Sequence, residues 1–286
     1  MIALVAALLA ADTLPFAPPI DRPLIYRQTE DRVARDGSAA HFILTEEVRY
    51  TRDGAGYLLT IRALSADPQA PEPAAKAFRA GMAPFIGVPV AIRLSAGGEP
   101  GEVVDAEATW SRVLDSISQA AATNPDRKAE LDATIAGFKA MPPAAREAMM
   151  KGPAIALLGL ALPPLPEGGS APLAESIDTP LGAPLESSGT LHRDTNRDGT
   201  IRYSADLDSD PAAAHRLADH IREAGGPAAA HADAISALRL HEHRETSLSA
   251  SSGLLLSSTS RIAAIDPAAP GGQRAIAQRG LALVSP

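Results

Sequence analysis

Two stretches of the chain carry side chains that could bind a metal ion, and the first is His241-Glu242-His243. Residues two apart on a strand share a face, so the imidazoles of His241 and His243 could converge on one ion, as in metal-dependent hydrolases built on sheets. A third ligand is not evident in the sequence, although His192 or His41 could come near in space. The pattern also fits a solvated strand face, because the neighbouring side chains on that face are polar.

The second stretch runs from Asp194 to Ile201 and matches the opening of a calcium-binding loop, D-x-N-x-D-G-x-I. Oxygen atoms of Asp194, Asn196 and Asp198 would suit a hard cation. The twelfth position, however, is Ala205, where such a loop needs a bidentate carboxylate, and the flanking residues alternate as strands do. The pattern therefore favours a hairpin turn, with a weak calcium site as the alternative.

Glu46 is a third residue of interest, because the alternation of its segment puts it on the apolar face. Leu44 and Val48 flank it at period two. Burying a carboxyl group among hydrocarbon side chains is costly unless it finds a partner. Two interpretations follow: a position at the rim or beside a partner such as Arg27, or a polar group inside a cavity.

Other catalytic signatures are missing from the sequence. It contains no G-x-S-x-G elbow, no S-x-x-K pair, no phosphate-binding loop and no dinucleotide-binding fingerprint. The absence of cysteine excludes disulfides, thiol nucleophiles and a lipobox. These observations favour a non-enzymatic protein without a cofactor. The single tryptophan, Trp110, fits an anchor of helix onto sheet, or alternatively a ligand-stacking side chain.

Composition narrows the class of partner. The formal net charge is -8 and no basic stripe stands out, which argues against nucleic acid. Hydrophobic residues make up 45% of the chain but aromatic residues only 3%, so the core must be mainly aliphatic. Beyond the N-terminal run, which is too short to cross a bilayer, no segment of the sequence has the roughly 20 apolar residues that a membrane-spanning helix needs.

The elements that would position these residues are mostly strands. Residues 24–64 predict three strands joined by the turns Arg35-Asp36-Gly37 and Arg52-Asp53-Gly54, since Asp-Gly between alternating runs is a strong hairpin signal. Further strands are expected at 88–94, 102–106, 187–195, 199–208, 237–250, 254–265 and 273–284. Helices are expected at 72–83, after residue 109, at 126–140, 144–150 and 211–224. The prediction is an α+β protein: a large curved antiparallel sheet of about ten strands, up to an incomplete barrel, packed against several helices on one face.

The domain prediction is a single unit over residues 24–286. Residues 152–185 are rich in proline and glycine and predict a long connection without periodic structure, which could instead divide the chain into halves at 24–151 and 186–286. Residues 12–23 form a proline-rich lead-in. Residues 1–11 are a short apolar run with the length of a signal-peptide core, which predicts a periplasmic or secreted protein.

The order of elements resembles exported proteobacterial proteins of unknown function. At the level of architecture it is similar to the lipoprotein-carrier group, the Lol-type carriers, in which a curved antiparallel sheet wraps helices. The features that carry this resemblance are the apparent signal, the 24–64 meander, the 88–106 hairpin running into the Trp110 helix, and the closing 237–284 meander. The resemblance implies a carrier of hydrophobic molecules, and no site residue is carried over from the group.

Three functions remain as hypotheses. The first is a non-enzymatic binding protein, with a cavity between sheet and helices that holds a lipid or acyl chain. The second is a cell-envelope scaffold without a cavity, whose partner meets an exposed sheet edge. The third is a metal-dependent hydrolase that uses His241 and His243. A solid filling of the inner face by the helices around Trp110 and Leu131 would exclude the first.

Overall fold

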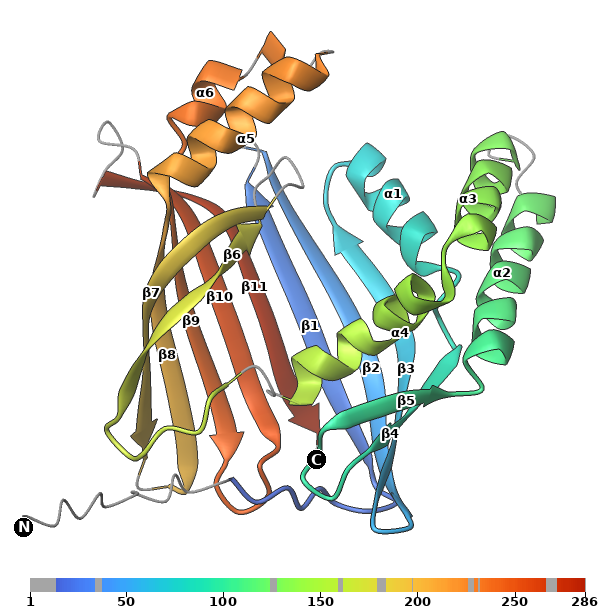
Figure 1. Ribbon diagram of the computed structural model, residues 1–286. Coiled ribbons are helices and arrows are strands. Elements are labelled where there is room, and N and C mark those ends of the chain that lie inside the picture. Colours follow the sequence, from blue (N-terminus) through green and yellow to red (C-terminus); the bar gives the residue numbers. More distant parts are fainter. Residues whose placement is uncertain are drawn as a thin grey trace, which may run out of the picture.

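The computed structural model describes residues 14–33, 38–123, 128–158, 162–178, 184–196, 198–225, 229–230, 232–265 and 272–285. Within these residues, eleven strands pair antiparallel into one curved, unclosed sheet (Figure 1). The strands are β1 (Pro23–Val33), β2 (Ala39–Asp53), β3 (Gly56–Gln69), β4 (Pro89–Leu94), β5 (Pro100–Val104), β6 (Ser170–Asp178), β7 (Pro184–Thr195), β8 (Thr200–Ser209), β9 (Leu240–Ser249), β10 (Leu255–Ile265) and β11 (Gln273–Ser285). The predicted α+β class with a large curved antiparallel sheet is confirmed.

Helices occupy three places around this sheet. They are α1 (Glu72–Met82), α2 (Ala106–Thr123), α3 (Lys128–Ala140), α4 (Pro143–Leu158), α5 (Pro211–Ala224) and α6 (Ala232–Ser236). In Figure 1, α1, α2 and α3 stand beside the β3–β5 side of the sheet, α4 lies across its concave face, and α5 and α6 stand at one end. Of these helices α4 lies across the concave face, and residues of α2 and α5 also join the clusters of buried side chains on that face.

The sheet is an up-and-down meander that is open at one point. Its order is β5-β4-β3-β2-β1-β11-β10-β9-β8-β7-β6, so every neighbouring pair except β1–β11 is also consecutive in sequence. The opening falls between β5 and β6, where the chain forms α2, α3 and α4. Strands from both halves of the chain thus belong to the same sheet, joined where the first strand pairs with the last.

Two of the expected turns have the geometry that their glycines allow. Gly54 has φ of 57° between β2 and β3, and Gly199 has φ of 78° between β7 and β8. Positive φ is strained for other residues, which is why Asp-Gly and Arg-Asp-Gly sequences recur at these hairpins. The turn expected at Arg35-Asp36-Gly37 lies outside the described residues.

The N-terminal lead-in packs against the sheet from Leu14 onward. The Phe16 ring lies edge-on to the rings of Tyr50 and Tyr57, with centroids 5.9 and 5.3 Å apart. Residues 1–13 lie outside the described part of the chain, so the signal peptide stays a prediction. No helix among the described residues is long and apolar enough to span a membrane.

The predicted connection over residues 152–185 is wrong in two respects. The helix expected to end at Met150 continues to Leu158, and residues 170–178 form β6, an additional strand. Pro153 lies inside α4, where its missing N–H leaves the carbonyl of Met149 without its helical partner, and this breaker obscured the helix in the sequence. A smaller correction concerns β9, which begins at Leu240 and not at Ala237, because the short helix α6 precedes it.

Apolar side chains of the inner face gather into two main clusters. The larger is built from β1–β5, β7–β10, α2 and α4, and includes Tyr26, Tyr50 and Trp110. The second lies around β6–β10 and α5, with Ile177, Leu207 and further aliphatic side chains. The candidate site consists of two cavities that adjoin the larger cluster.

Candidate functional site

Helix α4 covers the middle of the concave face and leaves a cavity on each side of it. Met150, Ala154, Leu157 and Leu158 are its buried residues. Exposed positions of the same helix, among them Ala156, line the cavities. The two cavities differ in chemistry, and we refer to them as the apolar cavity and the polar cavity.

The apolar cavity has a volume of about 360 Å³ and lies between α4, the end of α1 and the inner face of β1–β4. Its lining includes Trp110, which is 2% exposed and stacks at 5.2 Å on Phe138 of α3. The tryptophan is therefore both an anchor between helices and a wall of the cavity. The lining residues are Gln28, Leu44, Glu46, Ile61, Ala63, Met82, Phe85, Val88, Val90, Trp110, Met149, Met150, Gly152, Pro153, Ala156, Leu157 and Leu281.

Glu46 is the one ionisable residue in this lining among the described residues. It is 5% exposed, and within the described part of the chain neither a hydrogen bond nor a nearby charge contributes to the shift of its pKa. Burial raises the pKa of this carboxyl above its ordinary value. Of the two interpretations drawn from the sequence, the structure supports the polar group inside a cavity, because Arg27 faces Thr45 in the strand register and not Glu46.

The position of Glu46 is set by the strand pattern and by a local irregularity. Glu46 is opposite Tyr26 of β1 and Ala63 of β3, both buried residues of the inner face. The β2–β3 register shifts between Thr45 and Glu46, which leaves Leu64 of β3 as the extra residue. Bulges of this kind re-aim side chains and are frequent beside functional sites.

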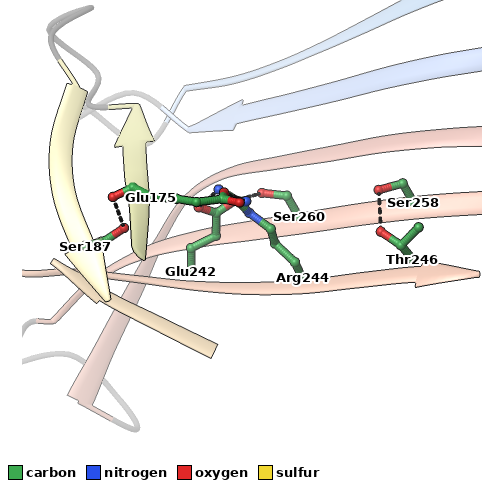
Figure 2. A network of polar contacts seen from close by, with 7 residues as sticks. All are labelled: Glu175, Ser187, Glu242, Arg244, Thr246, Ser258 and Ser260. Atoms are coloured by element: carbon green, nitrogen blue, oxygen red, sulfur yellow. Dashed lines mark hydrogen bonds and ion pairs between the residues drawn. The ribbon is translucent and has the colours of Figure 1, made fainter. Parts of the chain in front are cut away.

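The polar cavity, of about 410 Å³, lies on the other side of α4 against β6–β11. Figure 2 shows the network that lines it, in which Glu175, Glu242, Arg244 and Ser260 converge from β6, β9 and β10. The guanidinium of Arg244 donates to both oxygens of Glu242, over 2.7 and 2.9 Å, and also to Glu175. Ser260 donates to Glu242 over 2.5 Å. The buried Glu242, unlike Glu46, is thus fully surrounded by donors.

Charge pairing also raises the pKa of the Arg244 guanidinium. Its burial by itself lowers the pKa, but hydrogen bonds and charge from Glu242 and Glu175 outweigh that effect and raise it. Nearby, Thr246 and Ser258 share a hydrogen bond of 3.1 Å, and Arg279 donates to Glu30 over 3.2 Å. The hydrogen bonds of Arg244 and Ser260 to Glu242 and Glu175 thus link β6, β9 and β10.

The two cavities adjoin on the sheet surface. Gln28 and Leu281 of the apolar cavity face each other across β1 and β11, and Leu281 in turn faces Ser258, a residue of the polar cavity. Ala156 lines both cavities from above. A bulky side chain at residue 156 would therefore narrow both at once.

The metal candidates His241 and His243 lie on the opposite, convex face of β9. Their Nδ1 atoms lie 2.9 Å from Asp208 and 2.8 Å from Asp206, the residues directly opposite on β8. His41 instead bonds to Asp31 at 2.6 Å, on β2, which is four positions from β9 in the sheet.

His192 does not adjoin the pair either, since it faces Ser204 of β8 and not one of the two aspartates. Among the residues that the structure describes, no group of three or more histidine or carboxylate side chains could hold a metal ion.

The calcium candidates Asp194, Asn196 and Asp198 lie at the β7–β8 hairpin, as the hairpin interpretation predicts. The backbone N–H of Asn196 donates to the carbonyl of Thr200 over 2.8 Å, and Asp198 Oδ1 accepts from the Thr200 N–H over 3.0 Å. Asp194 lies 4.0 Å from Arg202. The carboxylates therefore cap the turn and meet a cation of the neighbouring strand.

Sequence reasoning missed the polar network on β9 although a signal was present. Leu240 and Leu248 mark the buried parity of this strand, and Glu242, Arg244 and Thr246 share that parity. Three polar residues in the buried register of one strand indicate an internal network, and the cation and anion two residues apart indicate their pairing.

Comparison with known proteins adds no family assignment: no protein-family model matches the sequence, and no curated protein matches it. The functional argument therefore depends on the geometry of the concave face.

Proposed function

We propose that the protein is a non-enzymatic binding protein for a hydrophobic ligand such as a lipid or an acyl chain. The observation that carries the proposal is the apolar cavity between α4 and the inner face of β1–β4. Its volume of about 360 Å³ lies in the range of roughly 300–1,000 Å³ that is typical of small-molecule sites, which are likewise mostly apolar with few polar groups.

The arrangement of the helices supports this proposal. The apolar residues of α2 and α3 that pack on each other, around Ile117 and Leu131, form a cluster of their own and do not fill the inner face. At the cavity, α4 contributes Met149, which is 42% exposed, and Met150. Methionine is flexible and polarisable, and it adapts to ligands of varied shape.

The location of the protein belongs to the same proposal. The apolar run at residues 1–11 and the absence of cysteine favour export to the periplasm or the medium. The architectural resemblance to the lipoprotein-carrier group supports a carrier role for hydrophobic molecules. We infer a periplasmic or secreted carrier, and native mass spectrometry of protein purified from the periplasm, scored for retained lipid, tests both parts.

A binding assay with matched variants tests the site itself. The probe is N-phenyl-1-naphthylamine, an uncharged dye that fluoresces in apolar surroundings. Ala156→Trp narrows the cavity, and we expect the dye to bind it at least about tenfold more weakly, a loss of about 1.4 kcal/mol. Ala77→Trp, at an exposed alanine of α1 outside the cavity lining, is the control and should bind like the parent protein.

Two results would contradict the proposal. One is dye binding that Ala156→Trp leaves unchanged. The other is no dye binding by the parent protein together with no co-purified lipid. Either would leave the scaffold hypothesis, in which the sheet edges β5 or β6 meet a protein partner.

A further inference from the structure

We propose that Glu46 is the polar anchor of the apolar cavity, and that the ligand is an amphiphile whose apolar body carries a cationic amine. This inference rests on the proposed function, because it names the class of molecule that the cavity takes. It arises from a feature of the cavity, the buried carboxyl of Glu46, that an ordinary hydrocarbon ligand does not explain.

The surroundings of Glu46 are unlike those of an ordinary buried carboxylate. The other lining residues of the cavity are uncharged, and most are Leu, Ile, Val, Met, Ala or aromatic. The inner-face neighbours in the register, Tyr26 and Ala63, provide no cation. The Tyr26 hydroxyl donates elsewhere, to the carbonyl of Leu255 over 2.8 Å. Glu46 therefore has no compensating group from the described part of the chain.

Three cations on β11 and α4, elements that contribute to the cavity lining, are paired with other carboxylates. These ion pairs are Arg279 with Glu30 at 3.2 Å, Lys151 with Glu147 at 2.6 Å, and Arg146 with Glu107 at 3.2 Å. The strand β11 lies two positions from β2 in the sheet, and α4 lies over the cavity. The pairing of these three cations leaves the negative charge of Glu46 for a cation that arrives from outside.

The energetics select the class of ligand. An isolated carboxylate in an apolar site is strongly disfavoured, so the empty cavity favours the protonated acid. An ammonium group beside Glu46 gives the carboxylate its missing partner in surroundings of low dielectric constant, where such a pair is strong. Its binding releases the proton from Glu46. The apolar body of the ligand meanwhile contacts the aliphatic lining.

Other head groups match the cavity less well. A carboxylate head group would face a second carboxyl group, and one of the two would have to stay protonated. An alcohol can accept a single hydrogen bond from the protonated acid but gains no ion pair. The aromatic walls at Trp110 and Phe85 also suit a cation, which is attracted to the face of an aromatic ring.

The experiment compares three ligands with the same ten-carbon chain: decylammonium, decanol and decanoate. Each is titrated by calorimetry near neutral pH, below its micelle-forming concentration, into the parent protein. We expect decylammonium to bind at least about tenfold more tightly than decanol, which is about 1.4 kcal/mol, and decanoate to bind most weakly. Glu46→Gln should remove the preference for decylammonium while it keeps decanol binding, which also shows that the variant is folded.

Glu47→Gln is the matched control. Glu47 is the next residue of β2, on the other face, where Arg62 donates to it over 3.0 Å. This variant removes one carboxylate from the same strand, which makes the net charge less negative, and should keep the preference for decylammonium. Glu47→Gln reduces the overall negative charge at least as much as Glu46→Gln, so a preference that is lost only in Glu46→Gln cannot come from general attraction of a cation to an acidic protein.

The outcomes separate the two proposals. If decanol and decylammonium bind the parent protein equally, or if decanoate binds most tightly, the cavity function stands and the amine inference is wrong. The amine inference is also wrong if Glu46→Gln keeps the preference for decylammonium, or if Glu47→Gln loses it. If none of the three ligands binds, the proposed function fails and the inference fails with it.

Discussion

Two buried glutamates on the same concave face have opposite surroundings. Glu46 and Glu242 are 5% and 4% exposed, and α4 separates the cavities that they line. Glu242 receives the two-pronged donation of Arg244 and a hydrogen bond from Ser260. Glu46 receives no such contact from the described residues. A buried glutamate carboxylate therefore has hydrogen-bond donors in one half of the sheet and lacks them among the described residues of the other, although the two side chains are equally buried.

The presence or absence of donors around a buried carboxylate distinguishes a role in folding from a role in binding. A buried charge that is surrounded by donors contributes to the structure as soon as the chain folds, and it leaves little for a ligand to add. A buried carboxyl without donors lowers stability and becomes favourable only when a partner arrives. The predictions below test this contrast, from the largest effect to the smallest.

Removal of the cation from the polar cavity should have the largest effect. Arg244→Ala leaves Glu242 buried without its fork of hydrogen bonds, and breaking a buried pair in this way costs about 3–5 kcal/mol. Since the Arg244 side chain is 30% exposed, we expect a loss near the lower end, about 3 kcal/mol, in urea unfolding at neutral pH. Arg216→Ala is the control, because Arg216 pairs with Asp210 on the exposed surface, and should cost no more than about 1 kcal/mol.

A loss of less than about 1 kcal/mol in Arg244→Ala would contradict this contrast. It would mean that water or another side chain compensates Glu242, and that the polar network does not hold β6, β9 and β10 together.

The apolar cavity should respond in the opposite direction. Glu46→Leu removes a carboxyl group that lacks a partner and should stabilise the empty protein by about 1–2 kcal/mol. Urea unfolding of the ligand-free protein at neutral pH measures this. A destabilised variant would show that Glu46 has a stabilising partner in the folded protein.

The pH dependence of stability gives an independent measurement of the same residue. Because the pKa of Glu46 is raised in the folded protein, the native state keeps a proton that the unfolded chain loses near its ordinary value of 4.5. The contribution of this residue to stability therefore falls as pH rises above that value, until the raised pKa is passed. In Glu46→Gln that part of the decline should disappear, whereas Glu47→Gln should keep it. Equal pH profiles for the parent protein and Glu46→Gln would contradict the raised pKa.

The smallest effect is expected at the hydrogen bond between Thr246 and Ser258. Thr246→Val alone leaves the Ser258 hydroxyl without this partner and should cost about 0.5–1 kcal/mol. Removing both hydroxyls in Thr246→Val/Ser258→Ala should cost less than the sum of the single variants, because neither polar group is then left behind. Additive costs would show that each hydroxyl bonds separately to water in the polar cavity.

The strands and hairpins of this protein were predictable because their signals are local. The alternation in β2 and the glycines at residues 54 and 199 act within a few residues, and the structure confirms both hairpins. The range predicted from the sequence for α4 was too short, and β6 was not predicted at all. Both errors have the same physical reason. Proline and glycine weaken the local pattern, and Pro153 is accommodated because Ala154 and Leu157 are buried against the core.

The candidate site was likewise predictable where local signals decide it and unpredictable where long-range contacts do. Alternation along β2 already placed Glu46 among apolar side chains, but the sequence left open whether Arg27 or a cavity would receive it. That choice depends on the register of β1 against β2 and on the path of α4, which are set by contacts between residues far apart in the chain. The pairing of Glu175 with Arg244 is likewise invisible locally, since 69 residues separate them.

By itself, the sequence determined which residues are extended, where the chain turns and which face of each strand is apolar, because these properties follow from side-chain alternation and backbone sterics over short distances. The tertiary structure alone decided that β1 pairs with β11, that α4 divides the concave face, and that one buried glutamate meets an arginine while the other faces a cavity. Those outcomes depend on long-range packing, in which the curvature of the whole sheet selects the neighbours of each side chain.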